Sequence, residues 1–191
     1  MADKLIILGI DPGSIKTGWG VIERVAVGSP DFVGDRVEEM DICTMHYEYK
    51  TLKWGTIKPP PDLSGKAGLP QRLYFISNAV SLLVGRFMPD VVAIEKGFGG
   101  VNQRTTLVMG ETLGAILVGV QGVISPYHKP PKIYEYAPTQ VKKTVCGKGN
   151  AKKYDVSRAV WCLLNCPEEF TSSADESDAL AVALTCAIKE W

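Results

Sequence analysis

Leu5-Ile6-Ile7-Leu8-Gly9-Ile10 is an unbroken apolar run that stops at Asp11-Pro12-Gly13. A run without polar alternation predicts a central strand that is buried on both faces, and the Pro-Gly pair predicts a turn directly after it. Such a strand needs other elements packed on both sides, which is the arrangement of an α/β domain. We therefore expect the remaining elements to extend a sheet around this strand and to cover both faces.

The segments on either side alternate between strand and helix patterns. Thr17–Glu23 has the pattern of a hairpin partner, and Val91–Ile94 is a second buried strand that is closed by Glu95. One strand or a hairpin is expected within Cys43–Ile57, and a short strand at Lys132–Tyr136. Helical spacing is found at residues 69–86, 103–120, 138–145, 151–164 and from about 173 to the terminus. The alternation predicts an α/β fold with a mixed sheet.

Length and charge narrow the class of protein. The chain has 191 residues, 46% of them hydrophobic, so we expect one domain over residues 1–191, with residues 25–68 as an enlarged strand and loop region. Twenty-one Lys and Arg balance twenty-one Asp and Glu. The net charge of zero excludes a uniformly basic coat protein and a highly charged disordered chain. A nucleic-acid enzyme stays possible, because such an enzyme needs a basic face rather than a basic total.

The compartment is suggested by the termini and the cysteines. No apolar run approaches the roughly 20 residues of a membrane-spanning helix, and no signal peptide precedes the first strand. Five cysteines, an odd number, suit a reducing interior where thiols pack mostly as small hydrophobes. Cys162 and Cys166 are one helical turn apart, but no nearby Cys or His completes a metal site, which favours packing. We expect a cytoplasmic protein that is neither secreted nor bound to a membrane.

Four carboxylates are placed where a site could form. Asp11 and Glu95 each end a buried strand, and strand ends of α/β sheets present ligands. Asp175 and Asp178 are three residues apart at the start of the last helix, so they share a face. Solvated strand ends and favourable interaction with the helix dipole explain the same residues without a function. The apolar run Ala179–Ala183 favours a site, because it implies that this helix packs on the sheet.

Four converging carboxylates would repel one another without a cation. Hard divalent ions with oxygen ligands, Mg²⁺ or Mn²⁺, are the natural counterions for such a set. Two ions about 4 Å apart would activate water on one side of a phosphate and stabilise the leaving oxygen on the other.

Four blocks of sequence carry a family pattern. They are Ile7–Ser14 with Thr17–Ile22, then Val92–Phe98, then Tyr136–Val145, and finally Ala174–Ala183. Together, and in this order, they closely resemble RuvC-type Holliday junction resolvases. The resemblance covers the chain from Leu5 to its end except for residues 25–68, which are markedly longer than the usual family connection.

The resemblance implies an RNase H-like fold, with a mixed five-stranded sheet flanked by helices. It also implies a homodimer that cuts two opposed strands of four-way junction DNA with two Mg²⁺ per site, Mn²⁺ substituting, and leaves 5′-phosphate and 3′-hydroxyl ends. By this likeness Asp11 bridges both metals, Glu95 holds one, and Asp175 with Asp178 holds the other. Phe98 matches an aromatic that the family places against bases at the crossover, whereas the alternative is an ordinary core residue.

A basic segment indicates where DNA would bind. Residues 129–158 carry eight Lys or Arg against two acids, an excess of six positive charges. Lys142 and Lys153 match family positions that contact DNA, and Lys143 and Lys152 are their nearest alternatives. Lys148, between two glycines, completes the set that we predict to bind DNA. A solvated charged face would explain the run equally simply.

The helix that follows Glu95 is a candidate for the interface between two copies of the chain. Leu107, Gly110, Leu113, Gly114 and Leu117 lie near one side, and small residues there would permit close approach of a second helix. Packing on the chain's own sheet accounts for the same pattern, so the dimer rests mainly on the family likeness.

Three other functions are weighed against a junction endonuclease. A junction-binding protein without cleavage is disfavoured by the four acids. An actin-like kinase or ATPase, which opens with a similar Asp-x-Gly turn, needs two such domains. An RNase H-like nuclease acting on RNA or on other branched DNA stays the nearest alternative.

Overall fold

The computed structural model describes residues 4–27, 46–63, 65, 67–97, 102–122, 129–165 and 173–190. A five-stranded sheet lies at its centre, built from β1 (Lys4–Asp11), β2 (Thr17–Val27), β3 (His46–Ile57), β4 (Val91–Glu95) and β5 (Lys132–Tyr136). The strand order is β3-β2-β1-β4-β5. β1, β2 and β3 pair antiparallel, whereas β4 is parallel to both β1 and β5. The mixed five-stranded sheet predicted from the sequence is therefore confirmed.

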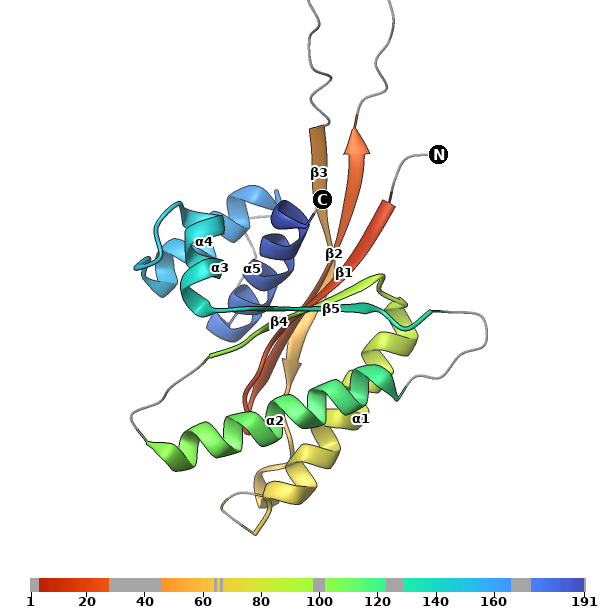
Figure 1. Ribbon diagram of the computed structural model, residues 1–191, viewed down its shortest axis with the longest axis vertical. Helices are drawn as coiled ribbons and strands as arrows, with labels where there is room; N and C mark the ends of the chain where they lie inside the picture. Colours follow the sequence, from red (N-terminus) through yellow and green to blue (C-terminus); the bar gives the residue numbers. More distant parts are fainter. Residues whose placement is uncertain are drawn as a thin grey trace, which may run out of the picture.

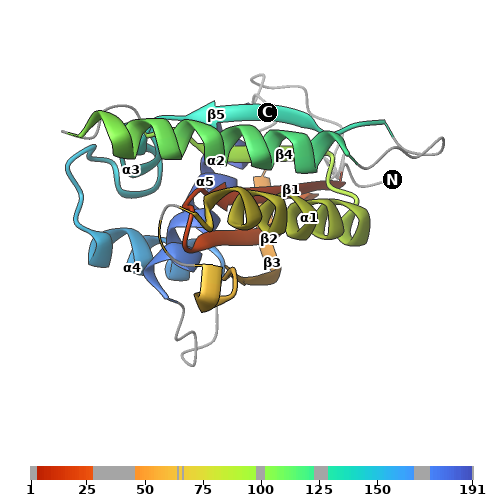
Figure 2. The ribbon, with the colours of Figure 1, turned by 90° about the horizontal axis from the view of Figure 1, so that it is seen from below.

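Helices cover both faces of this sheet, as Figures 1 and 2 show. One face carries α1 (Leu69–Phe87) and α2 (Gln103–Gln121), which pack against each other. The opposite face carries α3 (Pro138–Cys146), α4 (Lys153–Leu163) and α5 (Ala174–Lys189). A single turn of 3-10 helix, η1 (Pro61–Leu63), precedes α1. Each helix begins and ends within a few residues of its predicted range.

β1 is buried from both sides, as its apolar run predicts. Ile7 packs into the apolar cluster under α3, α4 and α5, whereas Leu8 and Ile10 pack into the cluster under α1 and α2. The alternation follows from the two-residue period of a strand, which sends neighbouring side chains to opposite faces. The last residues of the two central strands, Asp11 and Glu95, belong to the sheet itself.

Glycines in β1 and β2 let α5 lie directly against the sheet. A Cβ at Gly9 would be 2.1 Å from the backbone oxygen of Ala179, and one at Gly20 would be 2.5 Å from the side chain of Leu180. Distances this short exclude any other residue unless the helix moves away. Every residue of α5 from Ala179 to Ala187 is buried as a result.

The expectation that the cysteines pack mostly as small hydrophobes is met by only one of the three thiols that the structure describes. Cys186 is buried, whereas Cys146 is half-buried and Cys162 is exposed on α4. Cys43 and Cys166 lie outside the described residues.

Gly119 of α2 contacts α1 of the same chain, because a Cβ added to it would lie 2.4 Å from the Ser77 backbone oxygen. No helix in the described part of the chain is long and apolar enough to span a membrane.

Candidate acidic active site

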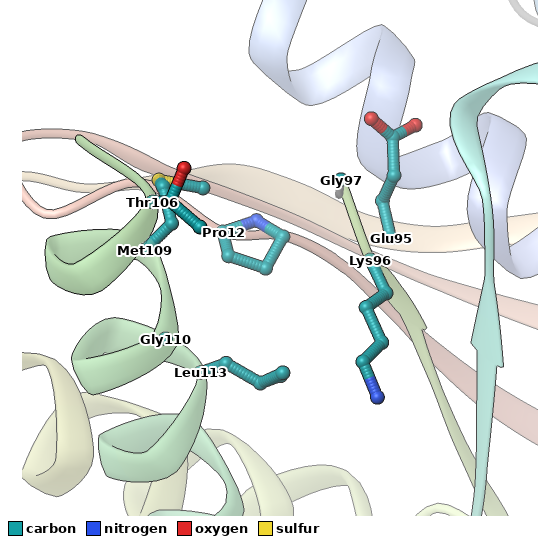
Figure 3. A pocket seen from close by; sticks show the side chains of 8 residues that line it. All are labelled: Pro12, Glu95, Lys96, Gly97, Thr106, Met109, Gly110 and Leu113. Atoms are coloured by element: carbon teal, nitrogen blue, oxygen red, sulfur yellow. The ribbon is translucent and has the colours of Figure 1, made fainter. Parts of the chain in front are cut away.

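Two carboxylates end neighbouring parallel strands. Ile10 of β1 is the register partner of Ile94 of β4, so Asp11 and Glu95, the next residue of each strand, lie at the same level of the sheet. Alternation along the strands sends both side chains toward the face that α5 covers. Figure 3 shows the Glu95 carboxylate directed toward that helical layer, while Lys96 points to the opposite side.

α5 brings two further carboxylates to the same edge. Asp175 and Asp178 lie at the start of this helix, and Gly18 of β2 permits its approach, because a Cβ there would be 2.0 Å from the Asp175 backbone oxygen. Asp178 forms an ion pair with Lys153, with 3.3 Å between Oδ2 and Nζ. Asp175 forms an ion pair with Lys16. Asp175 and Asp178 therefore each have a lysine partner.

The four acids interact electrostatically. Burial, and then the charges of Glu95, Asp178 and Asp175, raise the pKa of Asp11 to about 8. Burial, and then the charge of Asp178, raise the pKa of Glu95 to about 7. Two carboxyl groups that keep protons near neutral pH mark an edge where burial and like charges outweigh the nearby lysines. Perturbed groups of this kind cluster at functional sites.

This donor set fits a divalent cation. Carboxylate oxygens are the ligands that Mg²⁺ and Mn²⁺ prefer, and the raised pKa values of Asp11 and Glu95 show that added positive charge would be stabilising. Among the described residues, no three Asp, Glu, His or Cys side chains are already gathered into a metal cluster. Two of the four carboxylates, Asp175 and Asp178, are instead engaged by Lys16 and Lys153.

Glu176 lies among these acids but serves the fold. Its Oε1 accepts a hydrogen bond from Thr56 Oγ1 at 2.8 Å, and its Oε2 accepts one from the backbone N–H of Ser173 at 2.9 Å. These bonds tie the first turn of α5 to β3 and to the helix start, which is the capping arrangement expected there. Glu176 therefore positions Asp175 and Asp178 without joining them.

The predicted DNA-binding lysines separate into two groups. Lys142 and Lys153 lie near the acids, since both lower the pKa of Glu95. Lys148 pairs instead with Asp155, with 3.6 Å between Nζ and Oδ2. Lys143 and Lys152 are exposed, and Phe98 lies outside the described residues.

Lys16 is the residue at this site that sequence analysis missed. It lies in the turn between β1 and β2, and no charge cluster or periodicity marks it. Its contact with Asp175 spans most of the chain, so only the tertiary fold reveals it.

A small apolar hollow of about 150 Å³ adjoins Glu95 on its α2 side. Pro12 forms one wall, and Thr106, Met109 and Leu113 of α2 form another, as Figure 3 shows. The acidic edge is thus bordered by an apolar surface on one side and by lysines on the other.

Comparison with known proteins gives a consistent result. The family model described as crossover junction endodeoxyribonuclease RuvC matches residues 48–186. A crossover junction endodeoxyribonuclease RuvC of Ralstonia pickettii (strain 12J) is 36% identical over 178 residues, which cover 93% of this chain and 81% of the relative. The corresponding protein of Citrifermentans bemidjiense is 35% identical over 180 residues, covering 94% of this chain and 90% of the relative.

Solved structures agree with these relatives. The structure of T. thermophilus RuvC in complex with Holliday junction substrate superposes with a TM-score of 0.70 at 29% sequence identity. The match covers 96% of this chain and 93% of the other. The whole described fold, rather than one motif, is therefore shared.

Proposed function

The chain belongs to the crossover junction endodeoxyribonuclease RuvC family, and on this premise we propose that it cuts four-way (Holliday) DNA junctions by paired, symmetric nicks. One observation carries the proposal furthest. Asp11, Glu95, Asp175 and Asp178 lie at one sheet edge, where the charges of the other three act on Asp11, and two of the four have pKa values raised toward neutrality. An edge that favours added cations, beside lysines, suits hydrolysis of a phosphodiester.

We propose that these four residues hold two divalent ions, Mg²⁺ in the cell with Mn²⁺ as a substitute. The chemistry that such ions supply is an activated water and stabilisation of charge on the phosphate and the leaving oxygen. The charges of the other three acids all act on Asp11, so Asp11 would be the ligand most affected by bound cations. In this proposal Glu95 would help to hold one ion, and Asp175 with Asp178 would help to hold the other.

The protein's own residues prepare this edge. Asp11 and Glu95 retain protons near neutral pH and give them up when positive charge arrives, because burial and mutual repulsion disfavour their charged forms. Gly18 and Glu176 set the position of α5 and so of its two acids. Hydrolysis at such a site leaves a 5′-phosphate and a 3′-hydroxyl, which a ligase can rejoin.

The lysines of residues 129–158 form the DNA-binding face in this proposal. Lys142 and Lys153 contact the strand that is cut, because they lie beside the acids. The more distant members of the set, with Phe98 at the crossover, bind the arms of the junction. These distant lysines are Lys143, Lys148 and Lys152.

We propose that two copies of the chain act together, since a junction presents two equivalent strands. The exposed side of α2 offers an interface: Leu107 and Val118 are 64% and 66% exposed, and Gly110 and Gly114 have open space beside them. Leu113 and Leu117, by contrast, pack on the chain's own core. A Val118→Glu variant is expected to shift the protein from dimer to monomer in analytical ultracentrifugation, and an unchanged sedimentation profile would exclude α2 as the interface.

A junction assembled from synthetic oligonucleotides tests the proposed function. With each strand labelled at its 5′ end in turn and Mg²⁺ present, we expect nicks at symmetric positions on two opposed strands and products that a DNA ligase seals. Linear duplex, flap and RNA–DNA hybrid substrates are run in parallel. Equal cleavage of the hybrid would favour an RNA-directed nuclease instead.

The Asp11→Asn variant tests the site in the same assay. We expect nicking to fall by at least about 100-fold while junction binding is retained, because a required cation ligand is lost. Asp62→Asn, on exposed η1, is the matched control and is expected to cut normally. Undiminished cleavage by Asp11→Asn would overturn the assigned site.

A further inference from the structure

Lys16 is held in a fixed turn that aims its side chain at the acidic edge. Thr17 Oγ1 donates a hydrogen bond to the Gly13 oxygen at 2.7 Å, and Arg72 Nε donates one to the Ser14 oxygen at 3.0 Å. A Cβ at Gly13 would lie 2.2 Å from the Lys16 oxygen, so this turn is tightly closed. The backbone of Lys16 is therefore held in place from both sides of the turn.

The ammonium group of this residue meets one acid of α5. Lys16 Nζ forms an ion pair with Asp175 Oδ2, and the two side chains are 33% and 27% exposed. The pair is thus partly shielded from water, which strengthens it relative to a fully solvated pair. A second ion pair, between Lys4 of β1 and Glu23 of β2, involves none of the four acids.

A carboxylate engaged by an ammonium group is less available to a second cation. Asp175 is one of the four residues proposed to hold metal, and Lys16 engages one of its two carboxylate oxygens, Oδ2. A cation bound by this carboxylate would therefore compete with the ammonium group and weaken the ion pair. The free energy of the pair is subtracted from the free energy of metal binding.

We propose that Lys16 is an intramolecular competitor for the metal site, which neutralises Asp175 in the metal-free protein and thereby sets the affinity for the divalent ion. The inference deepens the proposed function and rests on it, since it presumes that Asp175 is a metal ligand. Lys16 is in this sense a positioning residue rather than a catalytic one. It also gives the metal-free protein a counterion at an edge where acids would otherwise face one another unpaired.

Metal titration without DNA tests this directly, because it requires no cleavage. Binding of Mg²⁺ is measured by isothermal titration calorimetry, and binding of Mn²⁺ by loss of its free electron-paramagnetic-resonance signal. Lys16→Met keeps the length of the side chain without its charge, and we expect it to lower the apparent Kd by roughly threefold to tenfold. Lys16→Arg retains the charge and is expected to bind metal like the parent protein.

Two controls separate the possible explanations. Lys4→Met removes a cation from the other ion pair and is expected to leave the metal Kd unchanged. Asp175→Asn removes the proposed ligand and is expected to weaken metal binding whichever residue stands at position 16. Thermal unfolding in a metal chelator shows that each variant is folded.

The outcomes are distinguishable. Tighter binding by Lys16→Met alone supports the proposal. Saturable binding with the same Kd in Lys16→Met, Lys16→Arg and the parent overturns it while leaving the proposed function intact. Absence of saturable metal binding in the parent protein would overturn the proposed metal site and this inference together.

Discussion

Asp11 and Glu95 lie side by side at the ends of two parallel strands, because the residues just before them, Ile10 and Ile94, are register partners. Neither acid is near the other in sequence. The parallel pairing of β1 with β4 brings the two carboxylates together at a half-buried edge of the sheet, where the pKa of both is raised. The consequences for stability, metal binding and cleavage can be measured separately.

The Asp11→Asn variant is expected to be more stable than the parent protein in the absence of metal at pH 8. The pKa of Asp11 is about 8 in the folded state against an ordinary value of 3.8, so ionisation opposes folding as pH rises above about 4. The penalty is absent below pH 4 and complete above pH 8. We expect the free energy of unfolding of the variant to exceed that of the parent by about 1–3 kcal/mol at pH 8 and to equal it near pH 4. Thermal or denaturant unfolding in the presence of a chelator measures this difference.

Asp62→Asn is the control for this comparison and is expected to change stability by less than about 0.5 kcal/mol. If the Asp11→Asn variant unfolds more easily than the parent protein at pH 8, the ionised Asp11 side chain does not oppose folding and the prediction is wrong.

Metal binding is expected to release protons. At pH 7 Asp11 is mostly protonated and Glu95 about half so, given pKa values of about 8 and 7, and metal competes with these protons. The apparent affinity for Mg²⁺ should therefore rise from pH 6 to pH 8 and level off above. Calorimetry in two buffers of different ionisation enthalpy should show about one to two protons released at pH 7 and fewer at pH 9.

An affinity that does not change between pH 6 and pH 8 would mean that neither carboxyl is a ligand. The Asp11→Asn variant should release fewer protons than the parent protein at pH 7, which assigns part of the effect to this residue.

Lys153→Met and Lys148→Met are expected to differ, although both remove one charge from the basic segment. Lys153 pairs with Asp178 and lowers the pKa of Asp11 and Glu95, so its loss should move the pH dependence of metal binding upward by roughly half a unit. Lys148 pairs with Asp155 and should leave that dependence unchanged. Each variant should reduce the slope of log binding constant against log salt concentration by about one, because one phosphate contact is lost.

Fluorescence anisotropy with a labelled junction at several salt concentrations gives the salt dependence of junction binding. Metal titration at several pH values gives the pH dependence of metal binding. Identical pH profiles for the two variants would show that Lys153 does not act on the acids.

Gly18→Ala is expected to disturb the site through the backbone of α5. Its Cβ would lie 2.0 Å from the Asp175 oxygen, so the start of the helix must move away from β2. We expect a loss of about 1–3 kcal/mol in stability and at least a tenfold loss of junction cleavage. Gly85→Ala on α1 has nothing within 4 Å of its added Cβ and should stabilise by about 0.5–1 kcal/mol without affecting cleavage. Normal cleavage by Gly18→Ala would show that α5 is not held by this contact.

Local patterns were sufficient to predict the elements of the fold. The apolar runs at residues 5–10 and 91–94 specify buried strands, and apolar spacing places the helices, because burial on one or two faces leaves a period in the chain. The four motif blocks were sufficient to name the family. They also singled out Asp11, Glu95, Asp175 and Asp178 as the candidate acids.

Other features depend on contacts between distant segments. The strand order sets Asp11 beside Glu95, and the close approach of α5 to Gly18 brings Asp175 to the same edge. The ion pair between Lys16 and Asp175 joins residues that share no local pattern. A period in the sequence reports which face of an element is buried, but it carries no information on which distant side chain lies opposite. That pairing, with the charges and pKa values it produces, arises only when the layers pack.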